Sequence, residues 1–216
     1  MSDQNQISLP NYIVRSLAGA WKLVLRNPKA MDHLDLSTDG FWKSFWALSV
    51  MFPAFVLWVF FNLQGGTVQT PNGIEISYPL LSEGIFFVIA LPFTAIVMAY
   101  FTKYLKISEN YASMVIAYNW VNAITYVILA VLTVILLSGV LGTQIAAILL
   151  MMLRFFFGFY IIWFTLKISL QISGLLAVGV LIFVKLLETA AQVMIFKIFN
   201  PEYFDAIFNA INNPPA

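Results

Sequence analysis

Five long apolar segments dominate this sequence, and they restrict its possible folds more than any other feature. Each has about the 20 residues that a helix needs to cross the hydrocarbon core of a bilayer. Apolar residues make up 61% of the chain and charged residues only 10%, whereas an ordinary soluble domain has about 25% charged residues. So few charges cannot cover a surface exposed to water. The sequence therefore predicts an all-α polytopic integral membrane protein with a single domain.

The predicted transmembrane domain covers residues 41–198, and short polar turns divide it into five spans. We expect these spans at 41–63, 80–101, 111–138, 144–166 and 172–198. Between the first two spans, Val68 and Thr70 alternate opposite Ile74 and Ile76. This pattern predicts a small hairpin closed by a two-residue turn at Asn72-Gly73.

An amphipathic helix at 11–27 is predicted within the N-terminal tail, residues 1–40. Its aliphatic and aromatic face lies opposite a basic face formed by Arg15, Lys22 and Arg26. This pattern is typical of a helix that lies on a membrane surface. We therefore expect it to contact anionic lipid headgroups, with packing against the protein's own core as the alternative.

A second amphipathic helix is predicted in residues 199–216, after the last span. Asn200 and Pro201 suit its beginning, and its aromatic residues, Tyr203 among them, share a face opposite Asp205. We expect this helix to lie on the membrane surface opposite to the N-terminal helix.

The basic residues predict the orientation, because Lys and Arg are enriched in cytoplasmic segments. With the N-terminus inside, only Lys197 lies clearly outside. The residues that then face the cytoplasm are Arg15, Lys22, Arg26, Lys29, Lys43, Lys103, Lys106 and Lys167. We expect a bacterial inner-membrane protein with a cytoplasmic N-terminus and a periplasmic C-terminus.

Three charged residues lie inside the predicted spans: Arg154, Lys185 and Glu188. Each costs about 2.5–3.5 kcal/mol on insertion scales. Consecutive spans are antiparallel, so a rise of about 1.5 Å per residue brings all three to a similar depth. One interpretation is a polar pathway or a headgroup site. The other is an Arg154–Glu188 pair that fixes helix register, with Lys185 extending toward the interface.

The third span also has a polar face, formed by Asn119, Asn122 and Tyr126. Hydrogen bonds between helices explain such a face, at roughly 0.6 kcal/mol or more per contact. A path for a solute is the alternative.

Several classes of function are not expected from this composition. The chain has no cysteine, and its only histidine, His33, lies outside the spans. Thiolate metal sites, haem ligation and a histidine-based triad therefore lack their residues. Glu188 is the only acid deep within a span, which argues against a catalytic carboxylate pair. The net charge of +1 argues against nucleic-acid binding. We expect no enzymatic activity, no cofactor and no metal.

Two short segments resemble the Yip-type family of Rab-GTPase-interacting membrane proteins. Residues 112–121 (Ala-Ser-Met-Val-Ile-Ala-Tyr-Asn-Trp-Val) look like the start of that family's third span. Leu25-Arg26-Asn27-Pro28 looks like the segment before the first span in uncharacterised bacterial relatives. The resemblance implies a non-catalytic role in binding, membrane shaping or trafficking-like organisation. We expect a Yip-like protein that acts through membrane lipids or a protein partner, as a homo-oligomer or an accessory or scaffold subunit. The alternative from the residues is a small transporter or channel that uses the intramembrane charges.

Overall fold

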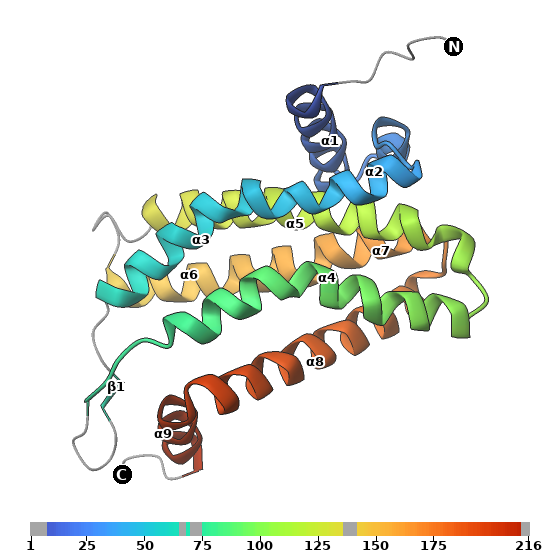
Figure 1. Cartoon of the computed structure of the whole chain (residues 1–216). Helices are drawn as coiled ribbons and strands as arrows, with labels where there is room; N and C mark the ends of the chain where they lie inside the picture. The colour runs from blue at the N-terminus through green and yellow to red at the C-terminus, as the bar shows by residue number, and fades with distance from the viewer. Residues whose placement is uncertain (1–7, 65–67, 70–74, 136–141, 213–216) are drawn as a thin grey trace.

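The computed structural model describes residues 8–64, 68–69, 75–135 and 142–212, which form mainly long helices (Figure 1). Five helical segments in this part of the chain are long and apolar enough to cross a membrane. They are Thr38–Leu63, Leu80–Tyr104, Ser108–Ile135, Gln144–Leu170 and Gly174–Phe199. The prediction of an all-α polytopic membrane protein is confirmed.

The observed spans differ from the predicted ones by a few residues at their ends. The first begins at Thr38, because the Ser37 side chain caps the helix through the Gly40 backbone N–H, at 3.1 Å. The fourth continues to Leu170, where Gln171 takes the left-handed conformation that commonly ends helices. Residues 136–138, the predicted end of the third span, lie outside the described residues.

The five spans are built from ten helical elements in chain order. These are α2 (Thr38–Lys43), η2 (Ser44–Trp46) and α3 (Ala47–Gln64); α4 (Leu80–Tyr104); η3 (Ser108–Asn110) and α5 (Tyr111–Ile135); α6 (Thr143–Phe155), η5 (Phe156–Ile161) and α7 (Ile162–Leu170); and α8 (Gly174–Phe199). The η5 segment is a π-helix within the fourth span.

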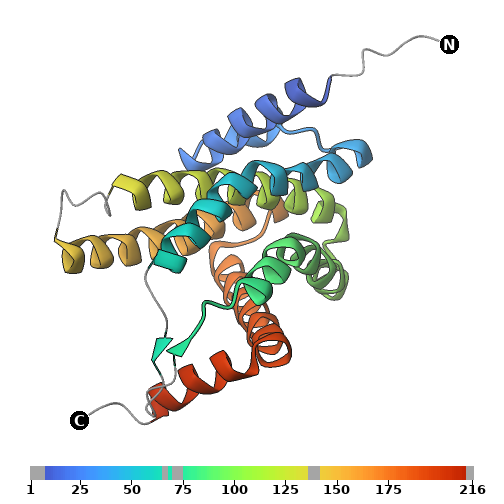
Figure 2. The same ribbon diagram turned by 60° about the vertical axis from the view of Figure 1, so that its left-hand side comes forward.

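Helix α5 is the centre of the bundle. It packs against α1 (Leu9–Val24), α3 and α7, and every residue from 114 to 121 is buried. The bundle is more open at the end where α3 ends and α4 begins, which we call the hairpin end. There α8 diverges from α6 (Figure 2), and Val131, Val134 and Ile135 of α5 are exposed.

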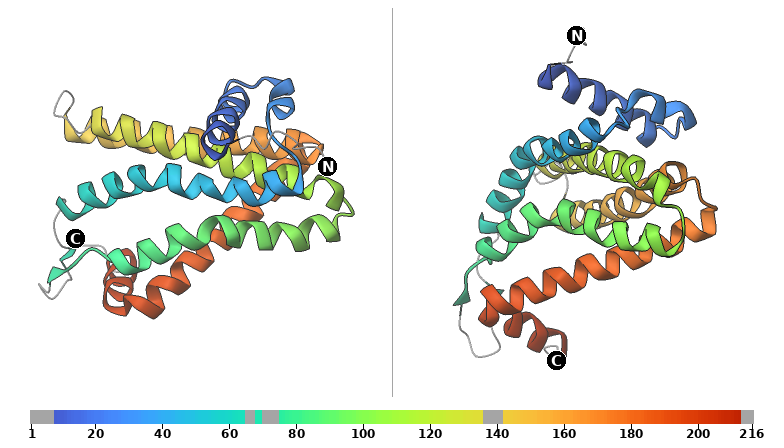
Figure 3. Two further views of the ribbon diagram at one scale, coloured as in Figure 1. Left: turned by 45° about the horizontal axis from the view of Figure 1, so that its top comes forward. Right: turned by 45° about the vertical axis from the view of Figure 1, so that its right-hand side comes forward.

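Helix α1 crosses α5 at a steep angle on one side of the bundle (Figures 1 and 3). We call the end of the bundle opposite to the hairpin end, where α2 and α5 begin, the α1 end. The Tyr12 hydroxyl donates to the Gly40 carbonyl at 2.8 Å, and the Trp120 indole N–H donates to the Tyr12 hydroxyl at 3.3 Å. The helix ends at Val24 rather than at residue 27, because Arg26 takes a left-handed conformation with φ of 61°.

One face of α1 is buried against the protein, as in the alternative in which the N-terminal helix packs on the protein's own core. A methyl group added at Gly19 would lie 2.9 Å from Leu34 Cδ2 and 3.2 Å from His33 Cβ, so the contact with the end of the following segment η1 (Pro28–His33) is close. Val14, Trp21 and Leu25 remain exposed. Contact of this outer face with lipid stays a prediction.

The hairpin end carries β1 (Val68–Gln69), β2 (Glu75–Ile76) and α9 (Pro201–Asn212). The predicted pairing of the two short strands is confirmed, but in a different register. Val68 pairs with Ile76, whereas a two-residue turn at Asn72-Gly73 would pair Gln69 with Ile76. The turn itself lies outside the described residues. The predicted C-terminal helix is present as α9, and it contacts α8 and β1.

Candidate functional site

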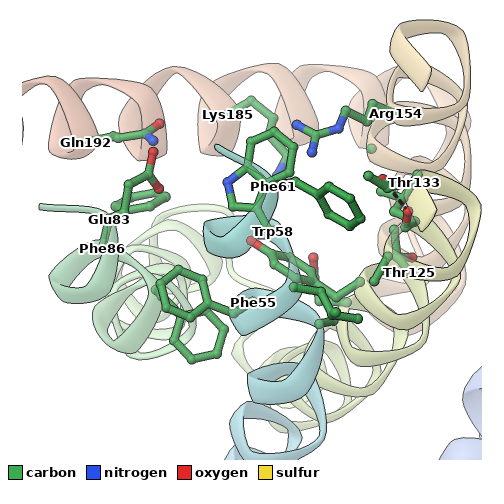
Figure 4. A pocket seen from close by; sticks show the side chains of 18 residues that line it. Phe55, Trp58, Phe61, Glu83, Phe86, Thr125, Thr133, Arg154, Lys185 and Gln192 are labelled. Atoms are coloured by element: carbon green, nitrogen blue, oxygen red, sulfur yellow. Dashed lines mark hydrogen bonds between the residues drawn. The ribbon is translucent and has the colours of Figure 1, made fainter. Parts of the chain in front are cut away.

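A cavity of about 400 Å³ lies between α3, α4, α5, α8 and the fourth span, toward the hairpin end (Figure 4). Part of its wall is aromatic: Phe55, Trp58, Phe61, Phe86, Phe87 and Tyr126. The polar side chains that line it are Glu83, Asn122, Thr125, Thr133, Arg154, Lys185 and Gln192. We call it the hairpin-end cavity. It brings two of the three predicted intramembrane charges to one place.

The local structure of the fourth span opens this cavity. Arg154 lies in the last turn of α6, directly before the π-helical segment Phe156–Ile161. Gly158, inside that segment, lines the cavity, and a methyl group added there would meet nothing within 4 Å. π-Helical turns occur frequently at functional sites, because the inserted residue changes which side chains face inward.

Arg154 has an aromatic partner instead of an acidic one. Its guanidinium carbon lies 3.9 Å from the centre of the Trp58 ring, a stacked cation–π contact. Within the part of the chain that the structure describes, no carboxylate lies within ion-pair distance of Arg154. The predicted Arg154–Glu188 pair is therefore wrong. The guanidinium donors are available to a ligand.

Glu188 instead accepts hydrogen bonds from three other helical positions. Its Oε2 lies 2.7 Å from Lys185 Nζ, and its Oε1 accepts from Tyr118 Oη at 2.7 Å and from Thr94 Oγ1 at 2.6 Å. Lys185 thus pairs with Glu188 instead of extending to the interface as predicted. The hydrogen bonds to the Glu188 carboxylate join α4, α5 and α8, and the carboxylate neutralises the Lys185 charge at the cavity wall.

The predicted polar face of the third span is divided between two roles. Asn122 and Tyr126 line the hairpin-end cavity. Asn119 does not, because its side chain is buried and donates to Ser44 Oγ at 2.9 Å. Thr125, which sequence reasoning did not include in this face, also lines the cavity. Its hydroxyl is buried without a hydrogen-bond partner in the structure.

Glu83 and Gln192 are further cavity residues that sequence reasoning did not identify as a site. Glu83 lies in the first turn of α4, where the helix dipole favours a carboxylate. Glu83 could have been recognised from the sequence, because an acid near the start of an apolar span is unusual. Trp58 gave none, since one aromatic residue among many carries no information about its contacts.

The cavity does not continue toward the α1 end. The Glu188 cluster and the layer of buried α5 side chains around Trp120 lie beyond it. Asn119 and Ser44 close the α3 side of that layer. Among the described residues, the side chains that line the cavity do not include those of this buried layer.

The three basic residues predicted on one face of the N-terminal helix have separate surroundings. Arg15 is exposed. Lys22 Nζ lies 2.6 Å from His33 Nε2. Arg26 lies beyond the helix, with its guanidinium 5.3 Å from the Tyr160 ring centre and 5.6 Å from that of Phe164. A single basic face of three residues is therefore wrong, because the left-handed turn at Arg26 directs its side chain to the bundle.

Among the described residues, no group of three or more His, Cys, Asp or Glu side chains is arranged to hold a metal ion. Comparison of the chain with protein-family models, curated proteins and solved structures finds no match. The fold and the cavity define a polytopic helical membrane protein with a polar site inside its bundle, and the resemblance to the Yip-type family stays a prediction.

Proposed function

We propose that this chain is a non-catalytic membrane protein that binds an amphiphilic, anionic-group-containing ligand in the hairpin-end cavity. The observation that carries the proposal is Arg154, a guanidinium inside a span that faces a cavity without an acidic partner among the described residues. Lipid or a lipid-like molecule fits a site with an aromatic wall inside the bilayer.

The energetic argument compares the two cations at the cavity. Lys185 has Glu188 as its counterion, whereas the described residues give Arg154 a contact with the Trp58 ring and no carboxylate within ion-pair distance. A cation–π contact contributes about 0.5–2 kcal/mol, which is less than the insertion cost of about 2.5–3.5 kcal/mol for a charged residue at mid-helix. An anionic ligand would offset the remainder, because charge-assisted hydrogen bonds to guanidinium are short and often bidentate.

A small transporter is the second candidate. The convergence of Arg154, Lys185 and Asn122 on one cavity favours it, since such convergence is what a transport site requires. Transport would need a second conformation in which the buried layer around Trp120 opens. Solute flux in proteoliposomes that depends on Arg154 would favour transport over binding.

We further propose that the α1 end faces the cytoplasm of a bacterial inner membrane and the hairpin end faces the periplasm. The support is the excess of lysine and arginine in the segments at the α1 end. The exposed face of α1, with Val14 and Trp21, would then contact the inner leaflet. A protein partner, a homo-oligomer or a role as an accessory subunit remains compatible with this arrangement.

A binding experiment tests the proposed function. Delipidated protein in a neutral detergent is titrated with dioleoyl phosphatidylglycerol, and native mass spectrometry measures retained lipid. The Arg154→Gln variant should lose saturable binding by about tenfold or more, because a charge-assisted hydrogen bond contributes about 1.5–3 kcal/mol. Arg15→Gln, which removes an exposed arginine outside the cavity, is the matched control. Equal binding by Arg154→Gln and the unmodified protein would disprove the proposal.

A further inference from the structure

Two charges of opposite sign face the hairpin-end cavity without pairing with each other. Glu83 comes from α4 and Arg154 from the fourth span, and no ion pair joins them. Figure 4 shows their side chains at different parts of the cavity, with Trp58 and Phe61 labelled between them. A ligand that carried only a negative group would leave Glu83 without an ion-pair partner among the described residues.

The two charges also differ in depth. Glu83 is three residues from the start of its span at Leu80, and Arg154 is ten residues from Gln144, where its span starts at the same end. A rise of about 1.5 Å per residue places Glu83 roughly 5 Å and Arg154 roughly 15 Å from the hairpin end. The acid is therefore closer to the membrane surface than the arginine.

This order of charges matches that of a zwitterionic phospholipid. In such a lipid the amine is outermost, the phosphate follows, and the acyl chains extend toward the bilayer centre. Gln192 lies near Glu83 in Figure 4 and adds a side-chain carbonyl that accepts hydrogen bonds. Thr125 also lines the cavity, and its buried hydroxyl has no hydrogen-bond partner in the structure.

We propose that the hairpin-end cavity recognises a zwitterionic headgroup of the phosphoethanolamine class, with the phosphate on Arg154 and the primary ammonium on Glu83. This inference rests on the proposed function and names its ligand. A carboxylate and a carboxamide oxygen favour an ammonium with N–H donors over a quaternary ammonium, which has none. The free headgroup and the complete lipid share this chemistry, and the location of the site inside the bilayer favours the lipid.

The test compares headgroups on the full-length protein in a neutral detergent. Dioleoyl phosphatidylethanolamine, phosphatidylglycerol and phosphatidylcholine compete for binding, with native mass spectrometry as the readout. We expect phosphatidylethanolamine to bind about tenfold more tightly than the other two. Glu83→Gln should remove this preference and keep the binding of phosphatidylglycerol. Glu202→Gln, an exposed acid on α9 at the same end, is the matched control and should keep the preference.

The outcomes separate this inference from the proposed function. Equal binding of all three lipids, lost in Arg154→Gln, would overturn the headgroup assignment and leave the proposed function intact. Lipid binding independent of Arg154 would overturn both. If free phosphoethanolamine competes as strongly as the lipid, the ligand is the free headgroup and the assignment to a lipid is wrong. If Glu83→Gln fails to fold, as judged by circular dichroism, Gln192→Leu should reduce the same preference, and an unchanged preference would contradict the inference.

Discussion

At the scale of single residues, Glu188 determines how the charges inside the bundle are arranged. Its carboxylate accepts hydrogen bonds from Lys185, Tyr118 and Thr94, so both oxygens have partners on the bundle's own helices. Arg154 is consequently left with Trp58. The binding chemistry of the cavity therefore depends on a residue that does not line it.

Replacing Glu188 by Gln should destabilise the protein. The change removes the counterion of Lys185, whose side chain is 31% exposed, and breaking a fully buried pair costs about 3–5 kcal/mol. Because Lys185 retains some exposure, we expect a loss of about 2 kcal/mol in unfolding free energy, measured by reversible denaturation in mixed micelles.

Asp39→Asn is the matched control for this variant. It breaks the Lys43–Asp39 pair, in which the Asp39 side chain is 66% exposed, and should cost less than about 1 kcal/mol. Similar losses in the two variants would contradict a structural role for Glu188.

At the scale of elements, two segments depart from regular transmembrane helices: α1, which crosses the bundle, and the π-helical turn in the fourth span. Helix α1 is held through Tyr12, which is 3% exposed and contacts Trp120 edge to face at 5.7 Å. The π-helical turn holds Gly158 at the cavity wall. Each element can be tested separately.

The docking of α1 should weaken at alkaline pH. Burial raises the pKa of the Tyr12 hydroxyl above its usual value of 10, so the folded state favours the neutral phenol. A group with a raised pKa contributes stability that is complete below pH 10 and declines as the pH rises through the folded value. Loss of α1 contacts above pH 10, followed by Trp120 fluorescence, is the expected result. In Tyr12→Phe the fluorescence change should be absent; a change of the same size would contradict the assignment.

Filling the cavity from the π-helical turn should block binding without unfolding the protein. A side chain at Gly158 meets open space, so Gly158→Leu should retain the helical circular dichroism spectrum and lose saturable lipid binding by about tenfold or more. Gly179→Leu on α8, where an added methyl group also meets nothing within 4 Å and which does not line the cavity, is the control. Unimpaired binding in Gly158→Leu would show that the ligand does not enter this cavity.

At the scale of the whole molecule, the bundle is closely packed at the α1 end and opens at the hairpin end. The long buried stretch of α5 forms the closed part, and the divergence of α8 from α6 accompanies the open part (Figure 2). This asymmetry makes the orientation in the membrane important, because it decides which leaflet supplies a ligand.

Labelling of introduced cysteines measures that orientation. The chain has no cysteine, so the Lys106→Cys and Glu202→Cys variants each have a single thiol that the reagent can label. Both positions are exposed. In right-side-out membrane vesicles, a membrane-impermeant maleimide should label the cysteine at Glu202 and not the one at Lys106. The reverse pattern would invert the proposed topology, and labelling of both in intact vesicles would contradict five spans.

The sequence by itself determined the elements that depend on local composition. Five segments with enough apolar length had to form spans. Their predicted ends were a few residues off, because the ends depend on caps such as those at Ser37 and Gln171. The amphipathic helices and the pairing of the two short strands, but not its register, also followed from local patterns. These features depend on the hydrophobicity of residues that are close together along the chain.

Only the tertiary structure decided which side chains meet. Arg154, Lys185 and Glu188 were predicted to lie at similar depth, but depth does not fix the rotation of each helix about its axis. The π-helical turn after Arg154 changes that rotation, and no periodicity in the sequence indicated it. As a result Lys185 pairs with Glu188, Arg154 stacks on Trp58, and the cavity includes Glu83. Contacts between helices depend on all five rotations together, which is why they could not be read from any one segment.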